Sequence, residues 1–119
     1  MQDFRNLEVW RLAHEMTLSI YRVTKSFPTD ERYGLTSQLR RAAVSIEANL
    51  AEGCGRGSDA DFARFVQLAL GSASEVECQL LISRDLGYLA ADSYEQHKDQ
   101  IERIKRMLIA LLKTLRNQA

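Results

Sequence analysis

Apolar side chains recur every three or four residues in four successive segments of this 119-residue chain, with short polar breaks between them. This spacing places the apolar side chains of each segment on one face of an α-helix. The single proline and the lack of alternating β-branched residues leave almost no room for strands. Because the chain is long enough for one core and too short for two, the sequence predicts a single all-α domain over residues 1–119.

Start and stop signals place the boundaries of the predicted helices. Phe27-Pro28 ends the first one and Gly87 the third, because proline cannot continue a helix and glycine adopts the left-handed turn that closes one. Ser58 and Asp92 each precede an acidic residue by three positions, a capping-box pattern that opens a helix. The predicted helices therefore span residues 6–26, 29–53, 58–86 and 92–116. Short connections place neighbours antiparallel, which predicts an up-down-up-down four-helix bundle.

Each predicted helix has an apolar face for the core. The first three carry additional apolar surface, which on the third consists of Leu68, Ile82 and Leu86. The predicted core residues are Val9, Leu12, Ala13, Met16, Ile20, Val23, Leu35, Leu39, Ala42, Ala43, Ile46, Leu50, Phe62, Phe65, Val66, Ala69, Ala73, Val76, Leu80, Ile101, Ile104, Leu108, Leu111, Leu112 and Leu115. Trp10, His14 and Tyr21 form a second stripe on the first helix, and Val44 and Ala48 face away from the core on the second. Extra apolar surface on so small a chain favours self-association. We therefore expect a homo-oligomer with these five residues at its interface.

A polar edge runs beside the apolar stripe of the second predicted helix. Its members, spaced by four, four and three residues, are Arg41, Ser45, Asn49 and Glu52. Packing requires only the stripe, so we interpret the edge as a structural network with Ser72 and Glu75 of the third helix, in which Arg41 and Glu75 form an ion pair. The alternative interpretation is a small-molecule or enzymatic site at Asn49, Glu52 and Glu75.

Composition excludes several classes of protein. Sixteen basic and sixteen acidic residues give zero net charge, which argues against a nucleic-acid binder that relies on bulk positive charge. The longest apolar run, Met107–Leu112, is too short to span a membrane, and Asp3 and Arg5 argue against a signal peptide. Cys54 and Cys78 are too few for a disulfide framework and indicate free thiols in a reducing compartment. We expect a cytoplasmic protein with no membrane contact.

Motifs for catalysis or metal binding are missing from the sequence. The stretch Gly53–Gly57 follows a helix rather than a strand and lacks the Lys-Ser/Thr of a phosphate-binding loop, so it predicts a helix end and a turn. His97 lies near an apolar face and is expected to pack in the core. Neither histidine is spaced for a carboxylate metal site or for activation of a cysteine. The sequence therefore predicts no catalytic residue, no cofactor and no metal.

Basic residues gather on the last predicted helix, opposite its apolar stripe. They include Arg103, Arg106, Lys113 and Arg116. One interpretation is a solvated face, since cations suit the negative end of a helix. Another is a strip that contacts RNA phosphates. A third is charge pairing with Glu75 or Glu77 of a neighbouring subunit.

Short motifs along nearly the whole chain resemble one known family in their order and spacing. They are Asp3-Phe4-Arg5-Asn6-Leu7, Val9-Trp10, Phe27-Pro28, Glu31, Tyr33-Gly34-Leu35, Gln38-Leu39-Arg40-Arg41-Ala42-Ala43, Ser45-Ile46, Asn49-Leu50-Ala51-Glu52-Gly53, Gly55-Arg56, Phe62, Arg64-Phe65, Gly71-Ser72 and Glu75. Together they are similar to the four-helix-bundle proteins first known from intervening sequences of bacterial 23S ribosomal RNA genes. Leu50 departs from the isoleucine expected there, without consequence for packing.

This resemblance implies a cytosolic antiparallel bundle that assembles as a homopentamer with a central opening, and it implies no established enzyme. A related branch, the accessory variability proteins of diversity-generating retroelements, forms basic pentamers that bind nucleic acid and a reverse transcriptase, whereas this chain has no net charge. We therefore expect a non-enzymatic oligomeric scaffold or interaction protein. Its expected partners are further copies of itself and an RNA or a nucleoprotein.

Overall fold

The computed structural model describes residues 3–118 and contains four α-helices and no strand in that range. The helices are α1 (Glu8–Val23), α2 (Leu35–Cys54), α3 (Asp59–Asp85) and α4 (Ala91–Gln118). Three short 3-10 helices accompany them: η1 (Phe4–Asn6), η2 (Thr24–Ser26) and η3 (Thr29–Glu31). The all-α fold class predicted from the sequence is thereby confirmed.

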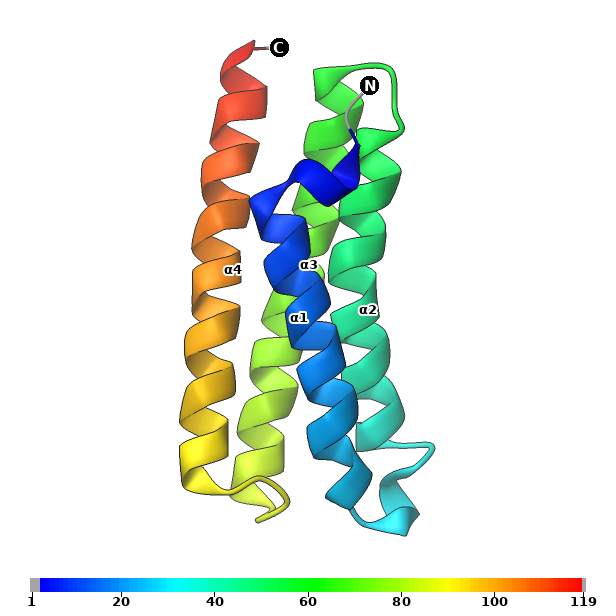
Figure 1. The fold of residues 1–119 in the computed structure, drawn as a ribbon, viewed down its shortest axis with the longest axis vertical. Helices are drawn as coiled ribbons and strands as arrows, with labels where there is room; N and C mark the ends of the chain where they lie inside the picture. Colours follow the sequence, from blue (N-terminus) through cyan, green and yellow to red (C-terminus); the bar gives the residue numbers. More distant parts are fainter. Residues whose placement is uncertain (1–2, 119) are drawn as a thin grey trace.

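The four helices lie side by side along the long axis of an elongated body that measures 45 × 23 × 20 Å (Figure 1). α2 packs along α3 and α3 along α4, while the shorter α1 contacts both α2 and α4. Both ends of the described chain and the α2–α3 connection lie at one end of the body, and the other two connections lie at the opposite end (Figure 1). The two connections that flank α2 are therefore at opposite ends of the molecule.

The core consists of the apolar stripes that the sequence predicted, with three exceptions. Met16, Leu50 and Ile101 are no more than 1% exposed, as are most members of the predicted set. Leu12, Val23 and Leu111 are only partly buried and pack against the edge of the core. Additional core members lie at helix ends and in the connections, among them Phe27, Cys54, Ala63, Leu89 and Tyr94.

The start of α2 was predicted six residues too early. Thr29–Glu31 form the separate helix η3, and α2 begins only at Leu35. Between them Gly34 adopts φ −111° and ψ −115°, which interrupts the helical path. The Glu31 carboxylate accepts a hydrogen bond from the Leu35 backbone N–H at 3.1 Å. A Cβ on Gly34 would stand 2.8 Å from that carboxylate, so glycine permits the Glu31 side chain to cap α2.

The other boundaries differ less from the predictions. α1 ends at Val23 because residues 24–26 tighten into η2, and α2 continues one residue beyond Gly53. Ser58 caps α3 as predicted, since its hydroxyl accepts a hydrogen bond from the Asp61 N–H at 3.1 Å. Gly87 adopts the expected left-handed conformation at φ 77°. α4 begins at Ala91, so Asp92 lies inside the first turn, where its carboxylate accepts from the Ser93 N–H at 2.9 Å.

Candidate functional site

The polar edge of α2 forms a small hydrogen-bond network with α3. The Ser45 and Ser72 hydroxyls lie 2.9 Å apart across the two helices. The Asn49 amide donates to the Ser45 carbonyl at 2.9 Å and to the Ser45 hydroxyl at 3.1 Å. Asn49 thus bonds to its own helix and reaches α3 only through Ser45, whereas the sequence suggested a network with α3 directly.

The charged residues of the predicted network do not join these three. Arg41 and Glu75 are both exposed and form no ion pair with each other in residues 3–118. Glu52 pairs instead with Arg56 one helical turn along, at 2.9 Å. Glu52 is therefore engaged by the α2–α3 connection, and no hydrogen bond joins Asn49, Glu52 and Glu75 to one another in the described residues.

The apolar stripe predicted on α1 divides into a packed part and an exposed part. The Trp10 ring is partly buried, packs against the core and stacks on His14, with ring centroids 4.9 Å apart. His14 also contacts α2, because its Nδ1 lies 2.9 Å from the Glu47 carboxylate. Tyr21 is 41% exposed and lies one turn beyond Leu18, which is 43% exposed.

Beside this stripe, Val44 is 39% exposed on α2 and Ala48 is exposed as well. Leu18 belongs to the same surface and was not predicted from the sequence. The four-residue spacing from His14 to Leu18 was a signal that could have found the leucine. We call His14, Leu18, Tyr21, Val44 and Ala48 the α1–α2 face.

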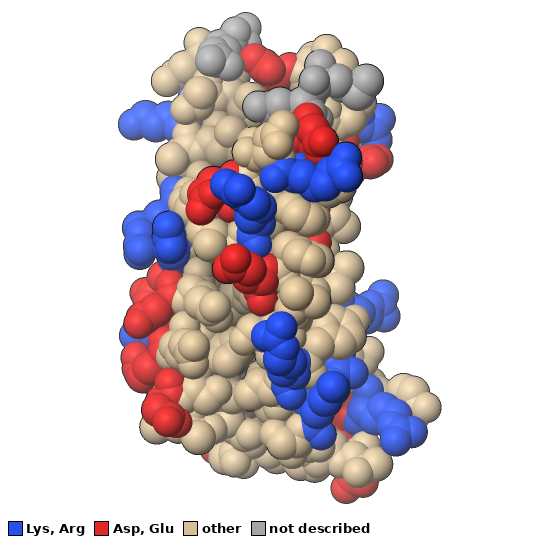
Figure 2. Space-filling model, in the orientation of Figure 1, with Lys and Arg blue, Asp and Glu red and all other residues tan. Residues whose placement is uncertain are grey.

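The four basic residues predicted as a strip on α4 are exposed, but their surroundings vary. Figure 2 shows acidic side chains along the part of α4 near its first turn and basic side chains toward its other end. Arg103, Arg106 and Lys113 have no carboxylate partner in residues 3–118, and Arg116 donates to the Gln67 side-chain carbonyl at 3.0 Å. Lys105, on the flank of this strip, pairs with Glu77 of α3 in the same chain at 2.9 Å.

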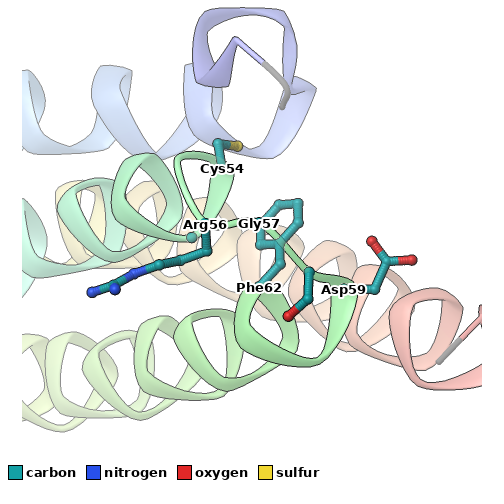
Figure 3. A pocket seen from close by; sticks show the side chains of 7 residues that line it. Cys54, Arg56, Gly57, Asp59 and Phe62 are labelled. Atoms are coloured by element: carbon teal, nitrogen blue, oxygen red, sulfur yellow. The ribbon is translucent and has the colours of Figure 1, made fainter.

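The glycine-rich α2–α3 connection borders a hollow of about 290 Å³ (Figure 3). Its charged lining residues do not point toward one another: Arg56 extends away from Asp59 and pairs with Glu52 (Figure 3). Cys54 is only 3% exposed, and burial raises the pKa of its thiol. A raised pKa leaves less thiolate at neutral pH, which opposes a nucleophilic role.

Gly53, next to the last residue of α2, has a role in helix packing. A Cβ there would lie 2.7 Å from the Phe62 ring. The glycine therefore permits close packing of α2 against α3, and it does not provide the helix stop that the sequence suggested.

His97 is a packed residue, as the sequence predicted. It is 4% exposed, and its Nδ1 lies 2.7 Å from the Ser93 carbonyl, to which it must donate. In the neutral ring, Nε2 then accepts from the Ser19 hydroxyl at 2.8 Å. Within residues 3–118 no three His, Cys, Asp or Glu side chains gather closely enough to hold a metal ion. None of the helices in that range combines the length and hydropathy that crossing a membrane requires.

Comparison with known proteins relates this fold to one family. The family described as 23S rRNA-intervening sequence protein matches residues 5–110. A crystal structure of a protein with unknown function from the S23 ribosomal protein family of Bacteroides thetaiotaomicron VPI-5482 has a TM-score of 0.82 and 26% sequence identity. That similarity covers 88% of this chain and 98% of the other. No curated protein matches the chain.

Proposed function

The chain belongs to the family of 23S rRNA-intervening sequence proteins, and from this membership we propose that it is a non-enzymatic, oligomeric interaction protein. The subunit is an antiparallel up-down-up-down bundle, and five subunits assemble in the cytoplasm around a central opening. The assembly holds an RNA or a nucleoprotein partner. Neither the family description nor that of the similar structure names an enzymatic activity. The number of subunits comes from the sequence resemblance.

The observation that supports assembly is the amount of large apolar surface left exposed by the bundle. On the α1–α2 face, Leu18, Tyr21 and Val44 are each about 40% exposed. Leu68 on α3 is 48% exposed, and Leu86, directly after the end of α3, is 54% exposed. These residues lie on two different surfaces of one chain, so a head-to-tail contact between copies would cover both. Heterologous contacts form a ring when the rotation between copies closes and an open filament when it does not; we propose the ring. Covering apolar area is their main driving force.

Light scattering at micromolar concentration tests the assembly. We expect a mass near five times the chain mass of 13.6 kDa. Leu18→Asp should reduce it to the monomer mass while the helical circular dichroism remains, because a carboxylate buried at a subunit boundary has no partner there. Tyr33→Asp is the matched control, since Tyr33 is 88% exposed in the α1–α2 connection and lies on no helix face. A wild-type protein that is monomeric would contradict the proposal.

Filter binding with structured RNA tests the proposed partner. If the α4 strip contacts phosphates, binding should be repeated around the oligomer and should weaken steeply with salt, because each neutralised phosphate releases counterions. Arg106→Glu combined with Lys113→Glu should abolish binding. Arg64→Glu combined with Arg84→Glu, which makes the same change of charge on α3, should reduce it far less.

The competing account of the α4 strip is charge pairing across a subunit boundary. Under that account, the Arg106→Glu and Lys113→Glu double variant would break up the assembly in light scattering. The wild-type protein would then show no salt-dependent binding of RNA. This combined outcome would remove RNA from the proposal and leave the oligomeric scaffold.

A further inference from the structure

The α1–α2 connection borders a hollow of about 180 Å³ with an unusual set of side chains. Three cations and three hydroxyls line it: Lys25, Arg32, Arg40, Thr24, Thr29 and Thr36. Its lining includes no carboxylate. We call it the cationic hollow. In Figure 2, Lys and Arg side chains gather over the corresponding part of the surface, near the end of α1 and the connection that follows.

Other hollows of this protein differ in their charge. The hollow at the α2–α3 connection includes Asp59, the one between α3 and α4 includes Glu77, and the one between α1 and α4 includes Glu15. Each of these three is lined by one carboxylate and one cation, so its lining has no net charge. A fourth hollow, beside Leu68, is lined by two cations, Arg64 and Arg116. In a chain with zero net charge, the cationic hollow is therefore a local concentration of positive charge.

Asp30 and Glu31 are close in sequence to the cationic hollow, but neither forms an ion pair with its cations in the described residues. Within residues 3–118, neither Lys25, Arg32 nor Arg40 forms an ion pair with a carboxylate. Both oxygens of Glu31 are occupied elsewhere, one by the Leu35 N–H at 3.1 Å and the other by the Tyr88 hydroxyl at 3.0 Å.

Arg40 is held in position at the wall of the cationic hollow. Its Nε donates to the Thr24 hydroxyl at 2.8 Å, and one terminal nitrogen donates to the Tyr21 carbonyl at 3.3 Å. The guanidinium also lies 4.6 Å from the centre of the Tyr21 ring. Three contacts therefore fix the orientation of the group, and the other terminal nitrogen has no hydrogen-bond partner in the described residues. A cation fixed in this way loses little conformational freedom when it binds an anion.

Thr36 adds a hydroxyl donor to the same wall. Its residue is only 7% exposed, and its hydroxyl makes no hydrogen bond to another described residue. Because Thr36 lines the hollow, this hydroxyl is available to a ligand or to water.

We propose that the cationic hollow binds a phosphate group. Guanidinium, ammonium and hydroxyl donors without a neutralising carboxylate are the groups that recognise a phosphate, which offers several strong acceptor oxygens. The residues come from a single chain, so binding does not depend on the assembly or on the α4 strip proposed above. The phosphate is either free or part of a nucleotide. Tyr33 follows Arg32 directly and is 88% exposed, which gives a nucleotide base an aromatic face for stacking.

Titration with inorganic phosphate, followed by two-dimensional NMR in a low-salt buffer at neutral pH, tests the proposal. We expect amide shifts concentrated in residues 24–40. Arg32→Gln and Lys25→Gln should each weaken binding about tenfold, because each removes a charge-assisted hydrogen bond. Both side chains are exposed, so these variants should fold as the wild type does. Arg22→Gln is the matched control, since it removes one exposed cation of α1 that does not line the hollow, and it should leave the affinity unchanged.

Adenosine monophosphate and adenosine, used as parallel probes, identify the source of the phosphate. A nucleotide site should bind adenosine monophosphate more tightly than inorganic phosphate, and Tyr33→Ala should weaken only the nucleotide. A site for free phosphate should bind the two alike and be insensitive to Tyr33→Ala. Either result supports the proposal.

Three results would overturn the proposal. One is the absence of shifts with both phosphate and adenosine monophosphate. Another is binding that Arg32→Gln and Lys25→Gln leave unchanged. The third is an equal loss in Arg22→Gln, which would indicate general attraction to a charged surface.

Discussion

The two connections that flank α2 are both hollowed and both carry arginine, yet they are held in shape by different interactions. At the α2–α3 connection, Gly53 lets the Phe62 ring pack closely, and Arg56 pairs with Glu52 at 2.9 Å. At the α1–α2 connection, hydrogen bonds to buried groups such as Thr24 hold the shape, and the cations have no carboxylate partner. At the α2–α3 connection the arginine is therefore paired within the chain. At the α1–α2 connection the cations keep hydrogen-bond donors that are available to a ligand.

The largest effect should come from filling the space at Gly53. In Gly53→Ala the new Cβ would lie 2.7 Å from the Phe62 ring and 3.0 Å from Phe65. We expect a loss of about 1–3 kcal/mol in the free energy of unfolding from overpacking, which exceeds the roughly 0.5–1 kcal/mol gained from alanine in a helix. Urea denaturation measures the difference.

Gly57→Ala is the control for this substitution at the same connection. No atom lies within 4 Å of its Cβ position, and its φ is not in the left-handed region. It should be neutral or stabilising by up to about 1 kcal/mol. If both variants have the stability of the wild type, packing at Gly53 does not hold this connection.

A smaller effect is expected from Thr24→Val at the other connection. Thr24 is 3% exposed; its hydroxyl donates to the Ile20 carbonyl at 2.7 Å and accepts from Arg40. Valine keeps the shape and removes both hydrogen bonds, so unfolding free energy should fall by about 1 kcal/mol. Arg40 should also lose its fixed orientation and bind phosphate less tightly. Unchanged stability together with unchanged phosphate affinity would show that the hydrogen bonds of Thr24 do not hold the α1–α2 connection in shape.

The smallest effect should come from Tyr88→Phe, which removes the hydroxyl bonded to Glu31 at 3.0 Å. That hydrogen bond requires the protonated phenol, and it raises the pKa of Tyr88 above its ordinary value of 10.0. The folded state therefore holds this proton more tightly than the unfolded chain, so the stabilisation is complete below about pH 10 and is lost as pH rises through the folded pKa. The urea midpoint of Tyr88→Phe should be lower than that of the wild type at neutral pH, and the two should converge in alkali. A difference that persists unchanged in alkali would contradict this account.

Most of the fold was predictable because it depends on local patterns. The apolar stripes of all four helices, the Ser58 cap and the Gly87 turn depend on residues within a few positions of one another. The start of α2 was missed because it depends on the fit of the Glu31 carboxylate against Gly34, a steric detail at 2.8 Å. Helical periodicity carries no information about such a contact.

The candidate sites were less predictable than the fold. The sequence placed Ser45 opposite Ser72, since both border apolar stripes that face each other, and the structure brings them to 2.9 Å. The ion pair suggested for Arg41 and Glu75 does not form in the described residues. The neighbouring carboxylate that does form an ion pair with another helix is Glu77, whose partner is Lys105 of α4. The partly exposed Trp10 was expected at an interface, and its contact with the core makes it also a structural residue.

The sequence by itself determined the four helices, their buried faces and the family, because helical periodicity and short motifs are properties of neighbouring residues. Only the tertiary structure decided which polar groups are already paired. Glu31 is satisfied by a tyrosine 57 positions away, and Arg40 is fixed by a threonine 16 positions before it. Hydrogen bonds require distances near 3 Å, and the rotation and offset of packed helices set those distances. The free donors at the α1–α2 connection are therefore a consequence of packing that no local pattern encodes.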